Sequence, residues 1–364
     1  MSAREARLRK DYVTYRARLL DLYDRSQSSL LVYELAMAET LLGHQDAALA
    51  RMREYAALGL AEGKEGTPLL DGVRADPRFA PTRERMAKNL QPVANATPAF
   101  ELPHDELVTE DIAYDPATKS FFVSSVRHRK IVAVDERGNA HDWVANDDAL
   151  GSACGLALTS GRLWVGSAEL APMVGYEPKK AHPTALLAYD LATGKRVERI
   201  ALAAEGEHAL TDLAADAKGD VFASDALGGG VYMVRVGAHT LEPLSADGTF
   251  LSPQAPAVLD EGRTLLVPDY IRGIARLDVA THAVTWLAHP GVAVNGIDGL
   301  YASGGALYAI QNGTLPVRLV RFELDAAGKT ILKATPLEQQ TPGLGEPTHG
   351  VFAGSSFFFL ANAG

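Results

Sequence analysis

The sequence is poor in cysteine and contains no long apolar segment. Cys154 is the single cysteine among 364 residues, so no disulfide can form within the chain and the redox compartment stays open. No run of about 18 apolar residues is present, which excludes a helix that spans a membrane. The N-terminal segment MSAREARLRKDYVTYRARLL lacks the apolar core of a signal peptide. The sequence as it stands therefore predicts a cytoplasmic protein, and a periplasmic or secreted protein whose signal peptide has been removed stays open as the alternative.

Positive charge is also scarce. The chain has 45 Asp and Glu residues against 35 Lys and Arg residues, a formal net charge of -10 at pH 7. A nucleic-acid surface needs clustered Lys and Arg, so the charge balance argues against a nucleic-acid partner. What the chain does have is 47% apolar residues, 33 Gly and 19 Pro. That composition provides a large core and favours many short strands joined by turns.

The N-terminal region, residues 1–90, has the apolar spacing of helices. The stretch SSLLVYELAMAETLLGHQDAALARMREYAALGL repeats apolar residues with a helical period, and Gly43 and His44 divide it into two helices. It resembles one tetratricopeptide-type hairpin, which is too short to form a solenoid. We expect an α-helical cap packed on its neighbour, with a module that binds a protein partner as the alternative. The stretch over 91–99 is the expected linker.

From residue 100 to residue 364 the period changes to two. Short strands such as KSFFVSS, RLWVGSA and TLLVPDY alternate with turn residues, which predicts a mainly β fold. One multi-strand unit occurs six times, with copies roughly 40 to 60 residues apart, as in a six-bladed β-propeller. The last copy stops after about two strands. Either residues 97–103 complete that blade or further strands lie outside this sequence.

In a propeller the first strand of each blade lines a central channel, so equivalent residues form a ring at one mouth of the channel. The six aligned residues are Glu110, Cys154, Thr211, Gln254, Asp298 and His349. The hairpins between the second and third strands reach the same mouth and contribute Arg127, His128, Asp225, Tyr270, Arg272, Asn312 and Asn362. Blade 2 carries an insertion there, about residues 169–184, which we expect to act as a lid or specificity loop.

Two carboxylates and several neutral oxygens around one point suit a hard divalent cation such as Ca²⁺. Such a cation could polarise a substrate carbonyl, with Asp298 or Asp212 as general base. The structural alternative is that these groups bond only to backbone N–H groups and water. Cys154 with His349 as its base is a further candidate nucleophile, although a lone cysteine is commonly a small buried apolar residue.

The blade sequences TEDIAYDP, LTDLAADAKGDVFASD and GIDGLYASGGALYAI resemble motifs of the SMP-30/gluconolactonase family of six-bladed propellers, over about residues 100–364. The resemblance implies a metal-dependent lactonase. It implies Glu110, Gln254 and Asp298 as metal ligands, with Asp298 also the catalytic base. Gln254 and Thr211 stand where the family has asparagine. The implied cation is Ca²⁺ first, with Zn²⁺ or Mn²⁺ as alternatives.

The leading interpretation is therefore a metal-dependent hydrolase of a lactone or a related small ester. The residues expected to orient the small-molecule substrate are Thr211, Asp212, Arg127, His128, Tyr270, Arg272, His349 and Cys154. Two alternatives stay open. One is a non-enzymatic propeller that binds a small molecule or a protein, and the other is a metal-free enzyme of the strictosidine-synthase-like type.

Overall fold

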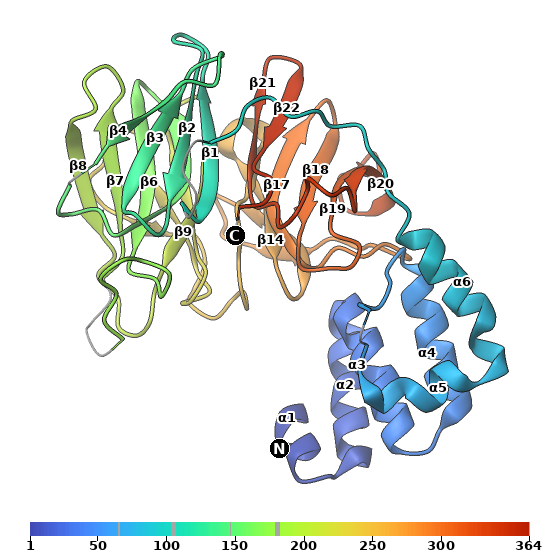
Figure 1. Ribbon diagram of the computed structural model, residues 1–364. Coiled ribbons are helices and arrows are strands. Elements are labelled where there is room, and N and C mark those ends of the chain that lie inside the picture. The colour runs from blue at the N-terminus through green and yellow to red at the C-terminus, as the bar shows by residue number, and fades with distance from the viewer. Residues whose placement is uncertain (65, 103–106, 146, 179–182, 364) are drawn as a thin grey trace.

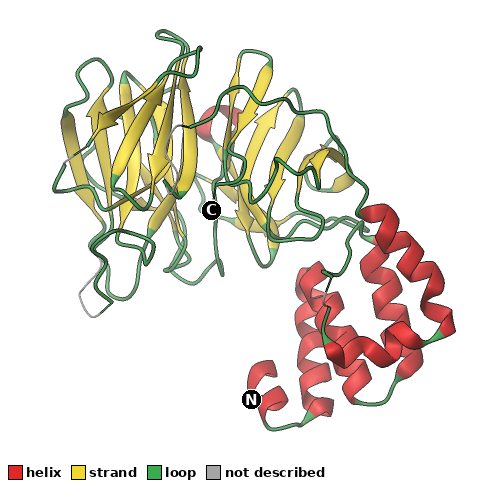
Figure 2. Cartoon of the chain, in the orientation of Figure 1, coloured by secondary structure: helices red, strands yellow, loops and turns green. Residues whose placement is uncertain are grey.

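The computed structural model describes residues 1–364 except for residues 65, 103–106, 146, 179–182 and 364. Helices form the N-terminal region and strands form the rest (Figures 1 and 2). None of the helices in the described ranges is long and apolar enough to cross a membrane.

The helical region begins with a short capped helix and ends just before the linker. Its helices are α1 (Ala3–Leu8), α2 (Tyr12–Ser26), α3 (Ser29–Leu41), α4 (Gln45–Ala57), α5 (Asp71–Ala75) and α6 (Ala80–Asn89), with 3₁₀ turns η1 (Pro68–Leu70) and η2 (Pro77–Phe79). Gly43, at φ +75°, lies in the turn between α3 and α4, where the sequence predicted the break. The apolar faces of α3 and α4 are buried within this region. A protein-docking role for this hairpin, like its tetratricopeptide character, stays a prediction.

The strands of the described part form five four-stranded antiparallel sheets and one two-stranded sheet. Blade 1 is β1 (Thr109–Asp115), β2 (Ser120–Ser125), β3 (Lys130–Val134) and β4 (Ala140–Val144). Blade 2 is β5 (Ser152–Thr159), β6 (Arg162–Ala168), β7 (Ala185–Asp190) and β8 (Arg196–Ala201). Blade 3 is β9 (Leu210–Ala215), β10 (Val221–Asp225), β11 (Val231–Val234) and β12 (Glu242–Pro243). Blade 4 is β13 (Ala257–Leu259), the turn η3 (Asp260–Gly262), β14 (Thr264–Asp269), β15 (Gly273–Asp278) and β16 (Val284–Trp286). Blade 5 is β17 (Ile297–Ser303), β18 (Ala306–Gln311), β19 (Arg318–Leu324) and β20 (Ile331–Gln339).

The sixth repeat departs from the expected complete blade. It forms only the pair β21 (Gly350–Ala353) and β22 (Ser356–Phe359), so the structure has five four-stranded blades rather than six. Within the described residues, 97–102 add no strand to this pair. Phe100 instead packs on Phe121 of blade 1, which also contacts Phe358. The ring is thus closed by aromatic packing, together with the bond from Thr109 N to Ala363 O (3.1 Å).

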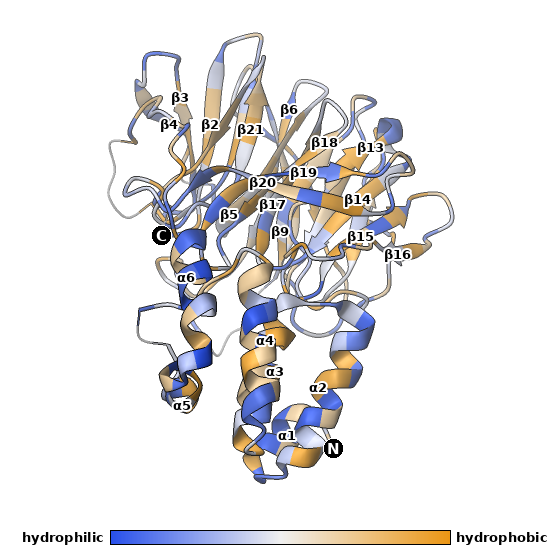
Figure 3. Cartoon of the chain, turned by 90° about the vertical axis from the view of Figure 1, so that its right-hand side faces the viewer, coloured by the Kyte–Doolittle hydropathy of each residue, from blue (hydrophilic) through white to orange (hydrophobic). Residues whose placement is uncertain are grey.

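Apolar side chains fill the spaces between neighbouring blades, and the strands carry most of the apolar colour in Figure 3. The first strands of neighbouring blades contact one another, which makes them the inner strands. We call the end of the channel at which these inner strands begin the mouth.

The helical region packs against mouth-side loops of blades 4 and 5 (Figures 1 and 3). Ser28 Oγ donates to Ile271 O (2.9 Å), and Ala61 N donates to Leu315 O (2.8 Å). Buried Arg318 bonds Gln311 Oε1 through Nε (2.8 Å), and burial lowers its pKa to about 10. The linker continues the contact, because Val93 bridges Gln339 on the outer strand β20. The helices therefore lie beside the mouth rather than at a distance from it.

Gly155 on β5 is needed for the close approach of the inner strands of blades 2 and 3. A Cβ atom at this position would lie 2.6 Å from Thr211 O and 2.7 Å from Leu213 N, which are backbone atoms that cannot rotate away. We therefore expect Gly155→Ala to lower the free energy of unfolding by about 1–3 kcal/mol, measured by urea denaturation. Gly343→Ala is the matched control, since nothing lies within 4 Å of a Cβ there. Equal stability of the two variants would contradict this packing argument.

Candidate active site at the channel mouth

Four of the six ring residues lie in irregularities of the inner strands. The pairing register shifts between Thr109 and Ile112 in β1, which places Glu110 in a bulge. Similar shifts surround Cys154 in β5, Thr211 in β9 and Asp298 in β17. A bulge turns side chains out of the regular alternation and is common beside active sites. In a regular strand, successive side chains alternate between the two faces of the sheet. The bulges interrupt this alternation, which allows these residues to point toward the channel.

Glu110 and Asp298 are the two carboxylates of the ring. Burial, followed by the charge of Asp298, raises the pKa of Glu110. Burial also raises the pKa of Asp298, an effect that His349 opposes and Asp212 reinforces. A carboxyl group whose ionisation is disfavoured by a neighbouring carboxylate lies near that carboxylate in a medium of low polarity. The charge of Asp298 thus acts on Glu110, as expected for two carboxylates at the same channel mouth.

His349 and Asp212 join the sixth repeat to blade 3 across the channel. His349 Nε2 lies 2.9 Å from Asp212 Oδ1, and Nδ1 lies 2.9 Å from Glu110 O. Both side chains are almost fully buried. Although burial opposes the shift, Asp111, Asp212 and Asp298 raise the pKa of His349 well above its ordinary value. The imidazole of His349 is therefore protonated, and both of its nitrogens donate hydrogen bonds.

Asp298 is held by a chain of side chains from two neighbouring hairpins. Asn312 Nδ2 donates to Asp298 Oδ2 (2.6 Å) and to Pro347 O (2.9 Å). Tyr270 OH donates to Asn312 Oδ1 (2.9 Å), which fixes the orientation of the amide. Burial and the charge of Asp298 raise the pKa of Tyr270 to about 12, so the phenol keeps its proton. Among the described residues none donates a hydrogen bond to Asp298 Oδ1, which can therefore take a water molecule or a ligand.

Asp111 is a buried acid of the site that the sequence argument missed. Its Oδ2 accepts from Leu156 N (2.6 Å) and its Oδ1 from Ile112 N (2.7 Å). Burial raises its pKa to about 6. The first of these bonds satisfies a backbone N–H at the bulge of the neighbouring inner strand. In the sequence, Asp111 can be recognised only as the acid that follows Glu110 in TEDIAYD. The bulge that turns both acids toward the channel has no recognisable sequence pattern.

The remaining ring residues make local bonds. Thr211 Oγ1 donates to Asp212 Oδ2 (2.6 Å), and Gln254 Nε2 donates to Ser252 Oγ (3.0 Å). Cys154 Sγ lies 3.5 Å from Ser152 O. Burial raises the pKa of the Cys154 thiol well above its ordinary value, which disfavours the thiolate that a nucleophile requires.

Two of the basic residues predicted at the mouth, Arg272 and His128, have their described contacts away from the ring residues. The Arg272 guanidinium lies 4.0 Å from the ring centroid of Trp286, on the outermost strand of blade 4. His128 is exposed on its hairpin, and its backbone N–H donates to Ser125 Oγ (3.1 Å). The carbonyl of Arg127 accepts from Val174 N (2.9 Å) and so ties the blade 2 insertion to blade 1. For Arg272 this corrects the expected placement, because stacking on an aromatic face is favourable for a guanidinium.

A second group of possible ligands lies at the mouth end of blade 3, where Asp225 was expected to face the channel. His208 Nδ1 lies 2.5 Å from Asp225 Oδ2, and its Nε2 lies 2.9 Å from Glu205 O. Asp225 Oδ1 also accepts from Ala209 N (2.8 Å) and Gly228 N (2.9 Å). Both ring nitrogens of His208 are occupied. This group therefore stabilises the hairpin and is not a metal centre.

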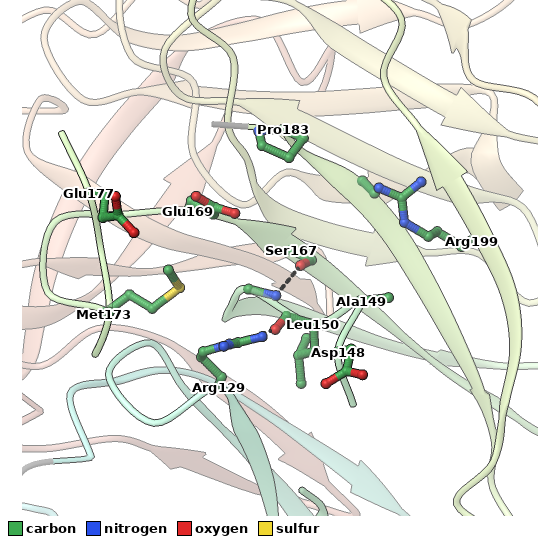
Figure 4. Close-up of a pocket in the computed structure, with 13 residues that line it drawn as sticks. Arg129, Asp148, Ala149, Leu150, Ser167, Glu169, Met173, Glu177, Pro183 and Arg199 are labelled. Carbon is green, nitrogen blue, oxygen red and sulfur yellow. Dashed lines mark hydrogen bonds between the residues drawn. The ribbon is translucent and has the colours of Figure 1, made fainter. Parts of the chain in front are cut away.

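A separate hollow lies under the blade 2 insertion (Figure 4). Its volume is about 260 Å³, and Arg129, Ser167, Met173 and Glu177 are among its lining residues. Arg129 Nε donates to Leu150 O (2.9 Å) at its edge. No ring residue lines this hollow among those described. The lid role of 169–184 stays a prediction, and residues 179–182 of that insertion lie outside the described part.

The structure is similar to solved β-propellers. Regucalcin from Agrobacterium tumefaciens, a calcium-binding protein, is 16% identical, with a TM-score of 0.50 over 69% of this chain and 80% of that chain. A gluconolactonase from Xanthomonas campestris is 16% identical, with a TM-score of 0.51 over 75% of this chain and 97% of that one. Virginiamycin B lyase from Staphylococcus aureus is 13% identical, with a TM-score of 0.51 over 71% and 80%. No protein-family model and no curated protein sequence matches the chain. At these identities the similarity shows the propeller fold alone.

Proposed function

We propose that the protein is a metal-dependent hydrolase of a lactone or a related small ester. The observation that carries the proposal is that Glu110 and Asp298 both lie in bulges of inner strands at the channel mouth, where the charge of Asp298 contributes to the raised pKa of Glu110. Maintaining two such acids side by side is unfavourable unless a cation or a reaction makes use of them. Two of the similar propellers, the calcium-binding regucalcin and the gluconolactonase, agree with this chemistry.

The donors at the mouth fit a hard cation, with one exception. Ligand atoms of Glu110, Asp212 and His349 all lie within 4.8 Å of one another. Carboxylate and amide oxygens suit Ca²⁺, so Glu110, Asp298 and the Gln254 carbonyl are the proposed ligands, with Asp212 beside them. His349 is the exception, because an imidazolium has no free lone pair to offer.

When bound, the divalent cation would polarise the carbonyl of the substrate and stabilise negative charge on its oxygen. Asp298 Oδ1 would take the proton of the attacking water, since Asn312 already occupies Oδ2. The imidazolium of His349 would keep Asp212 ionised and in place. Thr211, through its bond to Asp212, holds the carboxylate from the other side.

Titration calorimetry of Ca²⁺ into chelator-treated protein tests the cation site. We expect the wild-type chain to bind Ca²⁺ and the variants Glu110→Gln and Asp298→Asn to bind at least about tenfold more weakly, because each removes one ligand charge. Asp260→Asn, in the turn η3 at the opposite end of blade 4, is the control and should bind like the wild type. If the wild-type chain binds none of Ca²⁺, Mn²⁺ and Zn²⁺, the metal-dependent proposal is wrong.

One observation favours a second candidate, a metal-free enzyme that uses acid–base chemistry at the same ring. The imidazolium of His349 already supplies a positive charge among the buried carboxylates. Under this proposal Asp298 acts as a base without a metal. Hydrolysis or elimination that persists after complete chelation would favour this candidate over the first.

A further inference from the structure

Four exposed aliphatic side chains lie on segments next to one another at the channel mouth. Leu227, Leu251 and Ile271 lie on mouth-side loops of blades 3 and 4, and Leu30 lies at the start of α3. They are exposed to 59%, 63%, 40% and 36%. We call these four residues the apolar rim. Single exposed leucines are ordinary on protein surfaces, but a group of them next to a polar site requires a reason.

The segments that carry the apolar rim are joined to one another by hydrogen bonds. The Leu227 hairpin is tied to the Leu251 loop by Gly248 N to Gly228 O (2.8 Å). That loop is tied to the Ile271 hairpin by Tyr270 N to Ser252 O (2.9 Å). The hairpin is tied to the start of α3 by the bond from Ser28 to Ile271 O. The segments that carry the apolar rim therefore form a connected arc from blade 3 through blade 4 to the helical region.

The loops that carry the apolar rim are also connected to the ring residues at the channel mouth. Ser252, next to Leu251, accepts from the side chain of Gln254. Tyr270, next to Ile271, reaches Asp298 through the amide of Asn312. The loops that carry the apolar rim are thus within reach of the remaining atoms of a substrate whose carbonyl lies at Asp298.

The polar side chains of the ring leave few donors for substrate hydroxyl groups. Several donors at the mouth already donate hydrogen bonds within the protein. They are the hydroxyl of Thr211, the amide nitrogens of Gln254 and Asn312, and both nitrogens of His349. A sugar hydroxyl group that accepts a hydrogen bond from one of these donors would have to displace an existing bond, whereas an aliphatic chain requires no such bond.

We infer that the substrate of the proposed site carries an aliphatic chain, which lies on the apolar rim, and is not a sugar lactone. The inference rests on the proposed hydrolase function and specifies its substrate class. Covering an exposed leucine with a methylene chain removes apolar area from both partners. The acidic ring and the net charge of -10 make an anionic lipid surface an unfavourable alternative occupant.

The test compares kcat/KM for γ-butyrolactone, γ-octalactone and γ-dodecalactone with that for gluconolactone. We expect kcat/KM to rise by about threefold for each methylene that contacts the rim, and gluconolactone to be the poorest substrate. The double variant Leu227→Gln, Leu251→Gln should flatten this dependence while γ-butyrolactone is hydrolysed as before. Val236→Gln, Leu332→Gln is the matched control, because these residues are equally exposed, at 60% and 58%, but lie away from the mouth.

Binding of the matching non-hydrolysable γ-lactams separates the failure of this inference from the failure of the proposed function. Hydrolysis that is independent of chain length, or that prefers gluconolactone, overturns the inference and leaves the hydrolase proposal standing. If no lactone is hydrolysed but the long-chain lactam binds at least about tenfold more tightly than the short one, and only with an intact rim, the hydrolase proposal fails and the aliphatic ligand is supported. Rim-dependent binding to phosphatidylcholine vesicles without any chain-length effect on lactams would overturn the inference in favour of a lipid surface.

Discussion

Asp298→Asn is expected to reduce kcat for lactone hydrolysis by about 10²–10⁴-fold, the usual contribution of a general base. Asparagine keeps the size and the planar shape of the side chain but cannot accept the proton of the attacking water. The loss should appear in kcat rather than in KM, because the base acts in the transition state. Steady-state kinetics at saturating Ca²⁺ would measure it.

Two further variants make this result specific to the site. Asn312→Ala removes the donor that holds Asp298 Oδ2, and we expect an intermediate loss of about 10–100-fold. Asp260→Asn removes an exposed carboxylate far from the mouth and should retain full activity. Unchanged hydrolysis in Asp298→Asn would exclude this residue as the base and would shift attention to Asp212.

His349→Leu is expected to lower the free energy of unfolding by about 3–5 kcal/mol, because it leaves Asp212 buried without its partner. The folded-state pKa of His349 is raised above its unfolded value of about 6.5, so the imidazolium stabilises the folded state fully below that value. This stabilisation is lost as the pH rises through the folded-state pKa. The deficit of the variant should therefore be largest in mildly acidic buffer and shrink in alkaline buffer, measured by urea denaturation across the pH range.

His239→Leu provides the matched comparison. His239 Nδ1 lies 2.6 Å from Glu198 Oε2 in a similar pairing, but its side chain is 73% exposed. Water and salt screen such a pair, so we expect little change in stability. Equal effects of the two histidine substitutions, or a His349→Leu deficit that grows with pH, would contradict the buried imidazolium.

The β region and the inner strands that carry the ring residues were predictable from the sequence because they depend on local patterns that repeat. Alternation of apolar and polar residues predicts strands, and copies roughly 40 to 60 residues apart predict blades. Glu110 and Asp298 could be aligned since each stands at the same step of its repeat. The helix break at Gly43 was predictable for a similar reason, as glycine readily adopts positive φ.

Other features depend on contacts between residues far apart in the chain, and no local pattern encodes them. The bond of His349 to Asp212 joins the sixth repeat to blade 3, and it makes a possible ligand into a charged donor. The position of Arg272 depends on Trp286 of the outer strand, so the hairpin alone suggested the wrong direction. The contact of the sixth repeat with blade 1 depends on Phe121 and Phe358, which are far apart in the chain.

The sequence by itself determined the propeller period and the helical region, since these follow from residue order and short-range preference. Only the tertiary structure decided which groups of the ring are ionised, bonded or available. Those properties depend on burial and on partners that different blades bring to the same place, and a bulge of one residue is enough to change them.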